Sequence, residues 1–190
     1  MKITLKTGLV FSGLWIICKY LFFIVYPDAT SITPLLFANM FFLLSSISVG
    51  LFLHKKQEGF TNGNTLTDIK AAMTSGLPYA IVVSLFIYVY YQKIDPGFNK
   101  HQIELAEKLI NKSLMDKNII SKMKLENPSF EMMSTLKIKS ELLKGPRGFY
   151  KASSTAILSL LALMMLSLIY SIAITVIYRK VVSKGLSSPH

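Results

Sequence analysis

Signatures of catalysis are missing from this sequence. It contains one cysteine, Cys18, so no disulfide can form within the chain, and cysteine usage says nothing about its redox compartment. It contains no phosphate-binding loop, no HExxH zinc motif, and no recognisable Ser/His/Asp set or pair of buried carboxylates. We therefore expect the protein not to be an enzyme, and we expect no catalytic residue and no cofactor.

Metal ligands are also sparse. His101 and Glu104 lie close together in HQIE, but a zinc site needs three or four converging ligands. The other histidines, His54 and His190, are distant in sequence, and we expect both on the opposite side of a membrane from His101. The sequence therefore predicts no metal site.

Acidic residues are few, with 10 Asp and Glu against 21 Lys and Arg and a formal net charge of +11. A chain this basic is a candidate for binding nucleic acid. Here, however, the basic residues flank apolar runs or lie in one long connection, and they form no separate domain with interleaved aromatic residues. Anionic lipid headgroups explain the same charge with fewer assumptions, so we expect no nucleic-acid partner.

Apolar residues are abundant, at 52% of the chain, and they gather in four long runs. A helix needs roughly 20 predominantly apolar residues to cross a bilayer. The runs predict an all-α integral membrane bundle of four transmembrane helices, in a single membrane domain over residues 1–190. The first run is longer than the core of a signal peptide, so a cleaved signal is the less favoured interpretation. The expected helices cover about 8–26, 34–53, 71–92 and 152–178.

Local signals mark the boundaries of these runs. Thr65, with Asp68 three positions later, resembles a capping box that starts a short helix. Gly76 and Pro78 interrupt the beginning of the third run, either as a kink or as the point where an interfacial turn becomes the spanning helix. The sequence Gly-Pro-Arg-Gly at 145–148 predicts a turn before the last run.

The connection over 93–151 is polar, with a helical pattern. Apolar residues recur every three or four positions from Ile103 to Leu114, which predicts a one-sided helix. Asn127-Pro128 interrupts this pattern, and a second amphipathic stretch follows. We expect an extracytoplasmic amphipathic helical hairpin between the third and fourth spanning helices. Such a hairpin binds either the lipid surface or a partner protein, and the charge pattern alone does not separate these two.

Basic residues at the ends of the runs predict the orientation. Lys and Arg flank the start of the first run, the loop between the second and third runs, and the end of the last run, whereas the loop over 27–33 has none. This distribution predicts a multi-pass protein of the inner (plasma) membrane with both termini cytoplasmic. The lysines of 93–151 oppose this assignment, but so long a connection lies at the margin of the rule, and the short flanks carry more weight.

Two polar residues inside the runs, Lys19 and Asn39, are candidates for an intramembrane site. A charge at the centre of a spanning helix costs about 2.5–3.5 kcal/mol on insertion scales, and such residues often mark an ion or substrate path. The favoured interpretation is that Lys19 lies near the outer end of its helix and extends its ammonium to the headgroups. For Asn39, and for Ser167 and Ser171 in the last run, contacts between packed helices are favoured over a polar pathway.

Several short motifs occur in an order that is typical of one family. They are GLVFSG with Gly8 and Gly13, TLTDIKAAMTSG with Ala71 and Gly76, IYVYYQKIDPGF with Asp95, Pro96 and Phe98, Asn127-Pro128 with Phe130, and YRK. By these motifs the chain resembles a bacterial family of four-helix membrane proteins, the domain of unknown function forty-one ninety-nine. The stretch KIKSELLKGPRGFYKASS departs from the family's more direct passage into the last helix. The resemblance implies a topology and a membrane location, and it implies no mechanism.

Together these features favour a small non-enzymatic accessory or scaffold protein that acts through its extracytoplasmic amphipathic segment. Besides the lipid bilayer and anionic headgroups, we expect a membrane protein partner or a homo-oligomer. The alternative is a small transporter or channel. That function would require self-association, because four helices rarely enclose a path alone.

Overall fold

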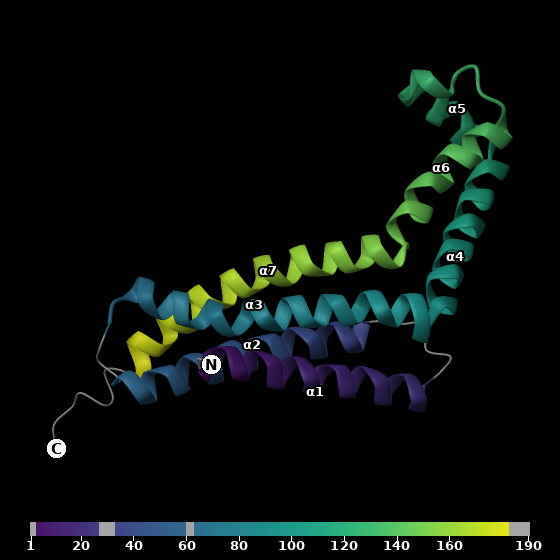
Figure 1. The fold of residues 1–190 in the computed structure, drawn as a ribbon. Coiled ribbons are helices and arrows are strands. Elements are labelled where there is room, and N and C mark those ends of the chain that lie inside the picture. Colours follow the sequence, from purple (N-terminus) through teal and green to yellow (C-terminus); the bar gives the residue numbers. More distant parts are fainter. Residues whose placement is uncertain (1–2, 27–32, 60–62, 183–190) are drawn as a thin grey trace. The chain divides into compact units, whose positions relative to one another are not determined.

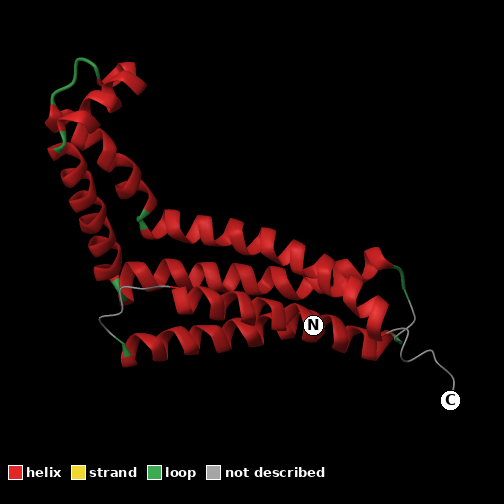
Figure 2. Ribbon diagram, turned by 180° about the vertical axis from the view of Figure 1, so that it is seen from behind, coloured by secondary structure: helices red, strands yellow, loops and turns green. Residues whose placement is uncertain are grey.

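The computed structural model describes residues 3–26, 33–59 and 63–182, and every regular element in these ranges is helical (Figure 2). Four helical segments are long and apolar enough to cross a membrane: Ile3–Val25, Pro34–Glu58, Thr65–Ile94 and Ala152–Val181. The predicted all-α class with four spanning helices is therefore confirmed. The chain divides into two compact units, which we call the bundle unit (Met1–Phe86 with Ile157–His190) and the hairpin unit (Ile87–Ala156).

The bundle unit contains α1 (Ile3–Val25), α2 (Thr33–Glu58), most of α3 (Thr65–Val89) and most of α7 (Ala152–Ile177), followed by the π-helix η3 (Tyr178–Val182) (Figure 1). Its outward faces are apolar, with large exposed side chains such as Val10, Phe41 and Leu85. Its buried positions include many small hydroxyl side chains, among them Ser12 and Ser46. This distribution is typical of helices that pack through small residues and face lipid.

Helix α3 is longer than predicted because no turn interrupts it at Gly76 and Pro78. Pro78 lies inside a continuous helix, so the short helix predicted before it and the spanning helix are one element. The predicted capping box is also wrong by one position. Asn64 is the residue that caps, since its Oδ1 accepts from the Thr67 backbone N–H at 2.8 Å and its own N–H donates to Thr67 Oγ1 at 3.0 Å. A proline is tolerated in a spanning helix when neighbouring groups satisfy the freed backbone carbonyl.

The hairpin unit begins with the π-helix η1 (Tyr90–Ile94) and continues through α4 (Pro96–Met115), α5 (Lys117–Glu126), the 3-10 helix η2 (Pro128–Phe130) and α6 (Thr135–Phe149). Asp95 caps α4 by accepting from the Phe98 N–H at 3.0 Å. The break predicted at Asn127-Pro128 is confirmed, because α5 ends at Glu126 and η2 begins at Pro128. The turn predicted at 145–148 is wrong, because α6 continues through Pro146 to Phe149. Pro146 lies in the last turns of α6, where one missing hydrogen bond bends or weakens the helix without ending it at once.

Helices α4 and α6 pack against each other within the hairpin unit. Ile138 and Leu143 of α6 are buried, and Lys139 Nζ lies 2.7 Å from Glu107 Oε1 on α4. The hydrogen bond and the positive charge of Lys139 lower the pKa of the Glu107 carboxyl below its ordinary value. Both side chains are partly exposed, so this ion pair orients the two helices more than it stabilises them.

Candidate functional site

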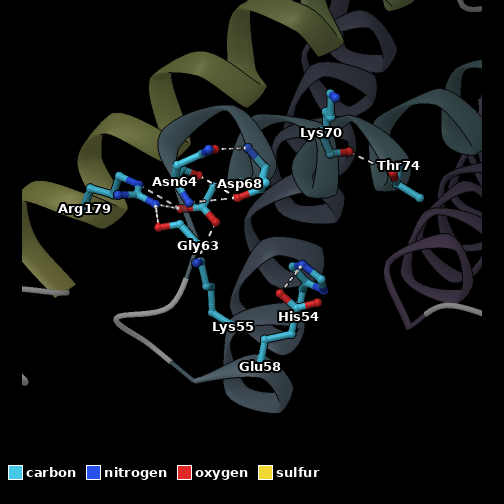
Figure 3. A network of polar contacts seen from close by, with 10 residues as sticks. His54, Lys55, Glu58, Gly63, Asn64, Asp68, Lys70, Thr74 and Arg179 are labelled. Carbon is cyan, nitrogen blue, oxygen red and sulfur yellow. Dashed lines mark hydrogen bonds and ion pairs between the residues drawn. The ribbon is translucent and has the colours of Figure 1, made fainter.

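A buried ion-pair cluster joins three helical segments at one end of the bundle unit (Figure 3). Asp68 lies in the first turns of α3, Lys55 near the end of α2, and Arg179 in η3. Lys55 Nζ is 2.6 Å from Asp68 Oδ1, and Arg179 reaches Asp68 Oδ2 from Nη2 at 2.6 Å and from Nε at 2.8 Å. The Asp68 and Lys55 side chains are each 2% exposed. Two cations therefore share one carboxylate in the interior of the protein.

The loop that precedes α3 takes part in the same cluster. The Gly63 carbonyl accepts a hydrogen bond from Arg179 Nη2 at 2.9 Å. Gly63 has a φ of +83°, in the left-handed region that favours glycine, and a Cβ there would lie 2.9 Å from Thr67 Oγ1. The start of α3, the end of α2 and the helix η3 are thereby held together by one set of polar contacts.

The geometry indicates that this cluster has a structural role, which is to link three helical segments through buried ion pairs. Both oxygens of Asp68 are engaged by cations, so the carboxylate is not available as a general base or as a metal ligand. Among the residues that the structure describes, no three His, Cys, Asp or Glu side chains converge on a point where a metal ion would fit. Removing one partner from such a cluster leaves an uncompensated buried charge, which typically costs about 3–5 kcal/mol.

Close backbone contacts hold the middle of the bundle unit. Ser75 Oγ of α3 donates to the Ser46 carbonyl of α2 at 2.8 Å, and the two hydroxyl oxygens are 3.0 Å apart. A Cβ added to Gly8 of α1 would collide with the Ser75 carbonyl oxygen, and one added to Gly76 would collide with Ser167 Oγ of α7. Residues from all four long helices therefore meet around Ser75 and Gly76, with a glycine at each closest approach.

A row of hydroxyl side chains follows the inner face of α7. Ser167, Ser171 and Thr175 are spaced by four residues and are fully buried, and their hydroxyl oxygens have no hydrogen-bond partner among the described residues. Several other hydroxyls of the bundle unit donate to their own helix, as Thr74 Oγ1 does to the Lys70 carbonyl at 2.8 Å. The favoured sequence interpretation, that Ser167 and Ser171 lie between packed helices, fits the close contact of Ser167 with Gly76.

The structure places Lys19 differently from the favoured interpretation. Its side chain is only 4% exposed and lies on the packed face of α1, together with Gly8, Ser12 and Trp15. A lysine that extends along the lipid surface to the headgroups would leave its stem exposed, so burial of the whole side chain was not anticipated. Lys19 is a protein-facing charge in the bundle unit.

Asn39 has a packing role that the sequence interpretation favoured. Its side-chain oxygen accepts a hydrogen bond from the Tyr79 hydroxyl at 2.6 Å, and its backbone carbonyl accepts from the same hydroxyl at 3.1 Å. Tyr79 is fully buried in α3. This contact joins α2 to α3, as polar side chains commonly do between spanning helices.

Sequence reasoning missed the ion-pair cluster. It used Lys55 and Arg179 only as signs of orientation, and it assigned Asp68 to a helix cap. One signal was present in the sequence, because Asp68 is a rare acidic residue beside a spanning run and lies at the same end as the basic residues of two other runs. A buried carboxylate requires a cationic partner, and the fold provides two.

Comparison with known proteins gives one result. A family model described as "Protein of unknown function (DUF4199)" matches residues 6–183 and so covers residues of both units. No curated protein and no solved structure matches the chain. The resemblance that the sequence motifs indicated is thereby confirmed.

Proposed function

The chain belongs to the DUF4199 family of proteins of unknown function, and from its own structure we propose that it is a non-enzymatic, membrane-anchored scaffold. In this proposal the bundle unit anchors the chain in the inner (plasma) membrane, with both termini in the cytoplasm. The hairpin unit binds a protein partner on the extracytoplasmic side. One observation carries the proposal, namely the set of large apolar side chains that the hairpin unit leaves exposed.

The hairpin unit exposes more large apolar side chains than it buries. Ile138 and Leu143 are buried in α6, whereas Met132 is fully exposed and Leu125 is 84% exposed. Helix α5 has no buried residue at all. A helix of ten residues is marginal by itself in water, and exposed apolar surface on a soluble segment marks an interaction site. The remaining strongly exposed apolar side chains of this unit are Leu109, Met115, Leu136 and Phe149.

The composition of this surface favours a protein partner over lipid. Met115 and Met132, which lie beside α5 and η2, are exposed, and Met123 and Met133 nearby are half-buried. Exposed methionine is typical of adaptable protein-binding surfaces. The lysines there are interspersed with acidic residues, and Lys122 lies 3.8 Å from Glu126. A mixed-charge surface of this kind is a poorer match to an anionic bilayer than a purely basic face would be.

Replacing the exposed apolar side chains tests this proposal. When the triple variant Leu125→Ser/Met132→Ser/Leu136→Ser is purified from membranes in mild detergent, we expect the amount of co-purified partner to fall more than tenfold. A few central apolar side chains usually dominate such an interface, so the loss of three should exceed that factor. The measurement is quantitative mass spectrometry of co-purified proteins, with recovery normalised to the chain itself.

The matched control changes charge in the same helix. Lys122→Gln/Glu126→Gln removes an exposed ion pair of α5, and an exposed pair contributes little to stability or binding. We expect this control to retain every partner of the natural chain. Retention of the same partners by the triple serine variant would contradict the scaffold proposal.

A small oligomeric transporter is a second candidate, which the polar interior of the bundle unit favours. Lys19 is buried, and the hydroxyl row of α7 lies inside the same unit. Flux measured in reconstituted vesicles separates the two candidates, with Lys19→Leu as the comparison variant. The scaffold proposal predicts no ion or solute flux above that of protein-free vesicles. A flux that Lys19→Leu abolishes would establish the transporter in its place.

A further inference from the structure

Positive charge exceeds negative charge at the end of the bundle unit that carries the Lys55–Asp68–Arg179 cluster. The one carboxylate of the cluster is already shared by two cations. The other acidic residue described in the bundle unit, Glu58, lies 3.2 Å from His54. We infer that this end binds the phosphate of an anionic phospholipid headgroup, through Arg179, Lys180 and Lys56. This inference concerns the bundle unit and does not depend on the proposed function of the hairpin unit.

The Arg179 guanidinium has more hydrogen-bond donors than its contacts within the protein use. A guanidinium carries five N–H donors. The single donor on Nε and the two on Nη2 point to Asp68 and to the Gly63 carbonyl. The two donors on Nη1 have no partner among the described residues, and the side chain is 33% exposed. Arg179 is therefore fixed by Asp68 and still presents unused N–H groups at the surface, which is a favourable arrangement for a phosphate oxygen.

Two lysines adjoin the cluster in sequence. Lys56 follows Lys55 at the end of α2, and Lys180 follows Arg179 in η3. Both are exposed, and within the described ranges neither has an acidic side chain within ion-pair distance. Because Lys55 and Arg179 meet on Asp68, the end of α2 and the helix η3 lie close together (Figure 3). Lys56 and Lys180 are the next residues on these two elements.

The apolar neighbours of these cations favour a lipid over free phosphate. Ile177 and Val181 lie one helical turn apart beside Arg179 and Lys180, and both are more than half exposed. They continue the apolar outer face of α7 up to the charged end. A ligand with a phosphate and acyl chains would contact both kinds of surface, whereas inorganic phosphate would use only the cations.

Native mass spectrometry of the full chain in a neutral detergent tests the inference. Bound phosphatidylglycerol and phosphatidylcholine are titrated separately, and inorganic phosphate is added as a competitor in a third arm. We expect phosphatidylglycerol to bind the natural chain at least tenfold more tightly than phosphatidylcholine, and we expect phosphate not to displace it. Lys56→Gln/Lys180→Gln should weaken the phosphatidylglycerol complex about 25-fold, since each basic group near an anionic headgroup contributes about fivefold.

The control removes the same number of charges elsewhere. Lys108→Gln/Lys112→Gln changes two exposed lysines of α4 and should leave phosphatidylglycerol binding unchanged. All three proteins should share one melting temperature, because none of these substitutions touches the buried cluster. Equal affinity for the two lipids, an equal loss in the control, or displacement by inorganic phosphate would each overturn the inference, the last by showing that the site takes a free anion.

Discussion

Asp68→Asn is expected to lower the free energy of unfolding by about 3–5 kcal/mol, because it removes the one negative charge that Lys55 and Arg179 share. Lys55 is almost completely buried and cannot reach water without opening the end of α2. The asparagine keeps the shape of the side chain, so the effect reports charge and not packing. The measurement is reversible unfolding in mixed micelles, or the melting temperature in a neutral detergent.

Two further variants test whether this loss comes from the cluster. Glu126→Gln removes an exposed carboxylate of α5 and should change the free energy of unfolding by less than about 0.5 kcal/mol. Arg179→Gln should cost less than Asp68→Asn, because the Asp68–Lys55 pair survives and the arginine side chain is partly exposed. If Asp68→Asn were as stable as the natural chain, the three helical segments would not meet on Asp68 as described.

Gly8→Ala should destabilise the protein by about 2–3 kcal/mol, although alanine is the better helix former. The added Cβ would collide with the backbone carbonyl oxygen of Ser75, and a backbone group cannot rotate away as a side chain can. Helix α1 would have to separate from α3, a cost at the upper end of that observed for overpacked interiors. The unfolding measurement used for Asp68→Asn applies here without change.

Gly13→Ala is the matched control, because it introduces the same methyl group in the same helix. A Cβ at Gly13 meets no atom within 4 Å. Alanine is favoured over glycine inside a helix by about 1 kcal/mol, so this variant should be unchanged or slightly more stable. Equal effects of the two substitutions would contradict the close contact between α1 and α3.

The spanning helices were predictable because one physical requirement determines them. A bilayer demands about 20 apolar residues in each crossing helix, and the four runs are visible without any structure. The exact first and last residues of these helices were harder to predict from the sequence. Helix α2 continues through its basic end to Glu58, and α3 passes through Pro78, because helices extend beyond the apolar core and neighbouring helices compensate for a proline.

The ion-pair cluster was harder to predict, because it depends on which helix ends meet. Asp68 and Arg179 are 111 residues apart in sequence, and no local pattern joins them. The burial of Lys19 was more accessible in principle. Gly8, Ser12, Trp15 and Lys19 recur at intervals of three and four along α1, and this spacing places them on one helical face. An interpretation based only on the position of Lys19 near the outer end of its helix favours an exposed lysine, because it does not consider which helical face Lys19 shares.

The central proposal is a membrane topology in which the connection over 93–151 is extracytoplasmic and the end of α2 is cytoplasmic, with four helices able to cross the membrane. The most direct test replaces Cys18 by serine and introduces a single cysteine, either Lys112→Cys in α4 or Lys56→Cys in α2. In intact cells, a membrane-impermeant maleimide should label the Lys112→Cys variant at once. It should label the Lys56→Cys variant only after the membrane is permeabilised. Labelling of both variants before permeabilisation, or of Lys56→Cys alone, would contradict this account.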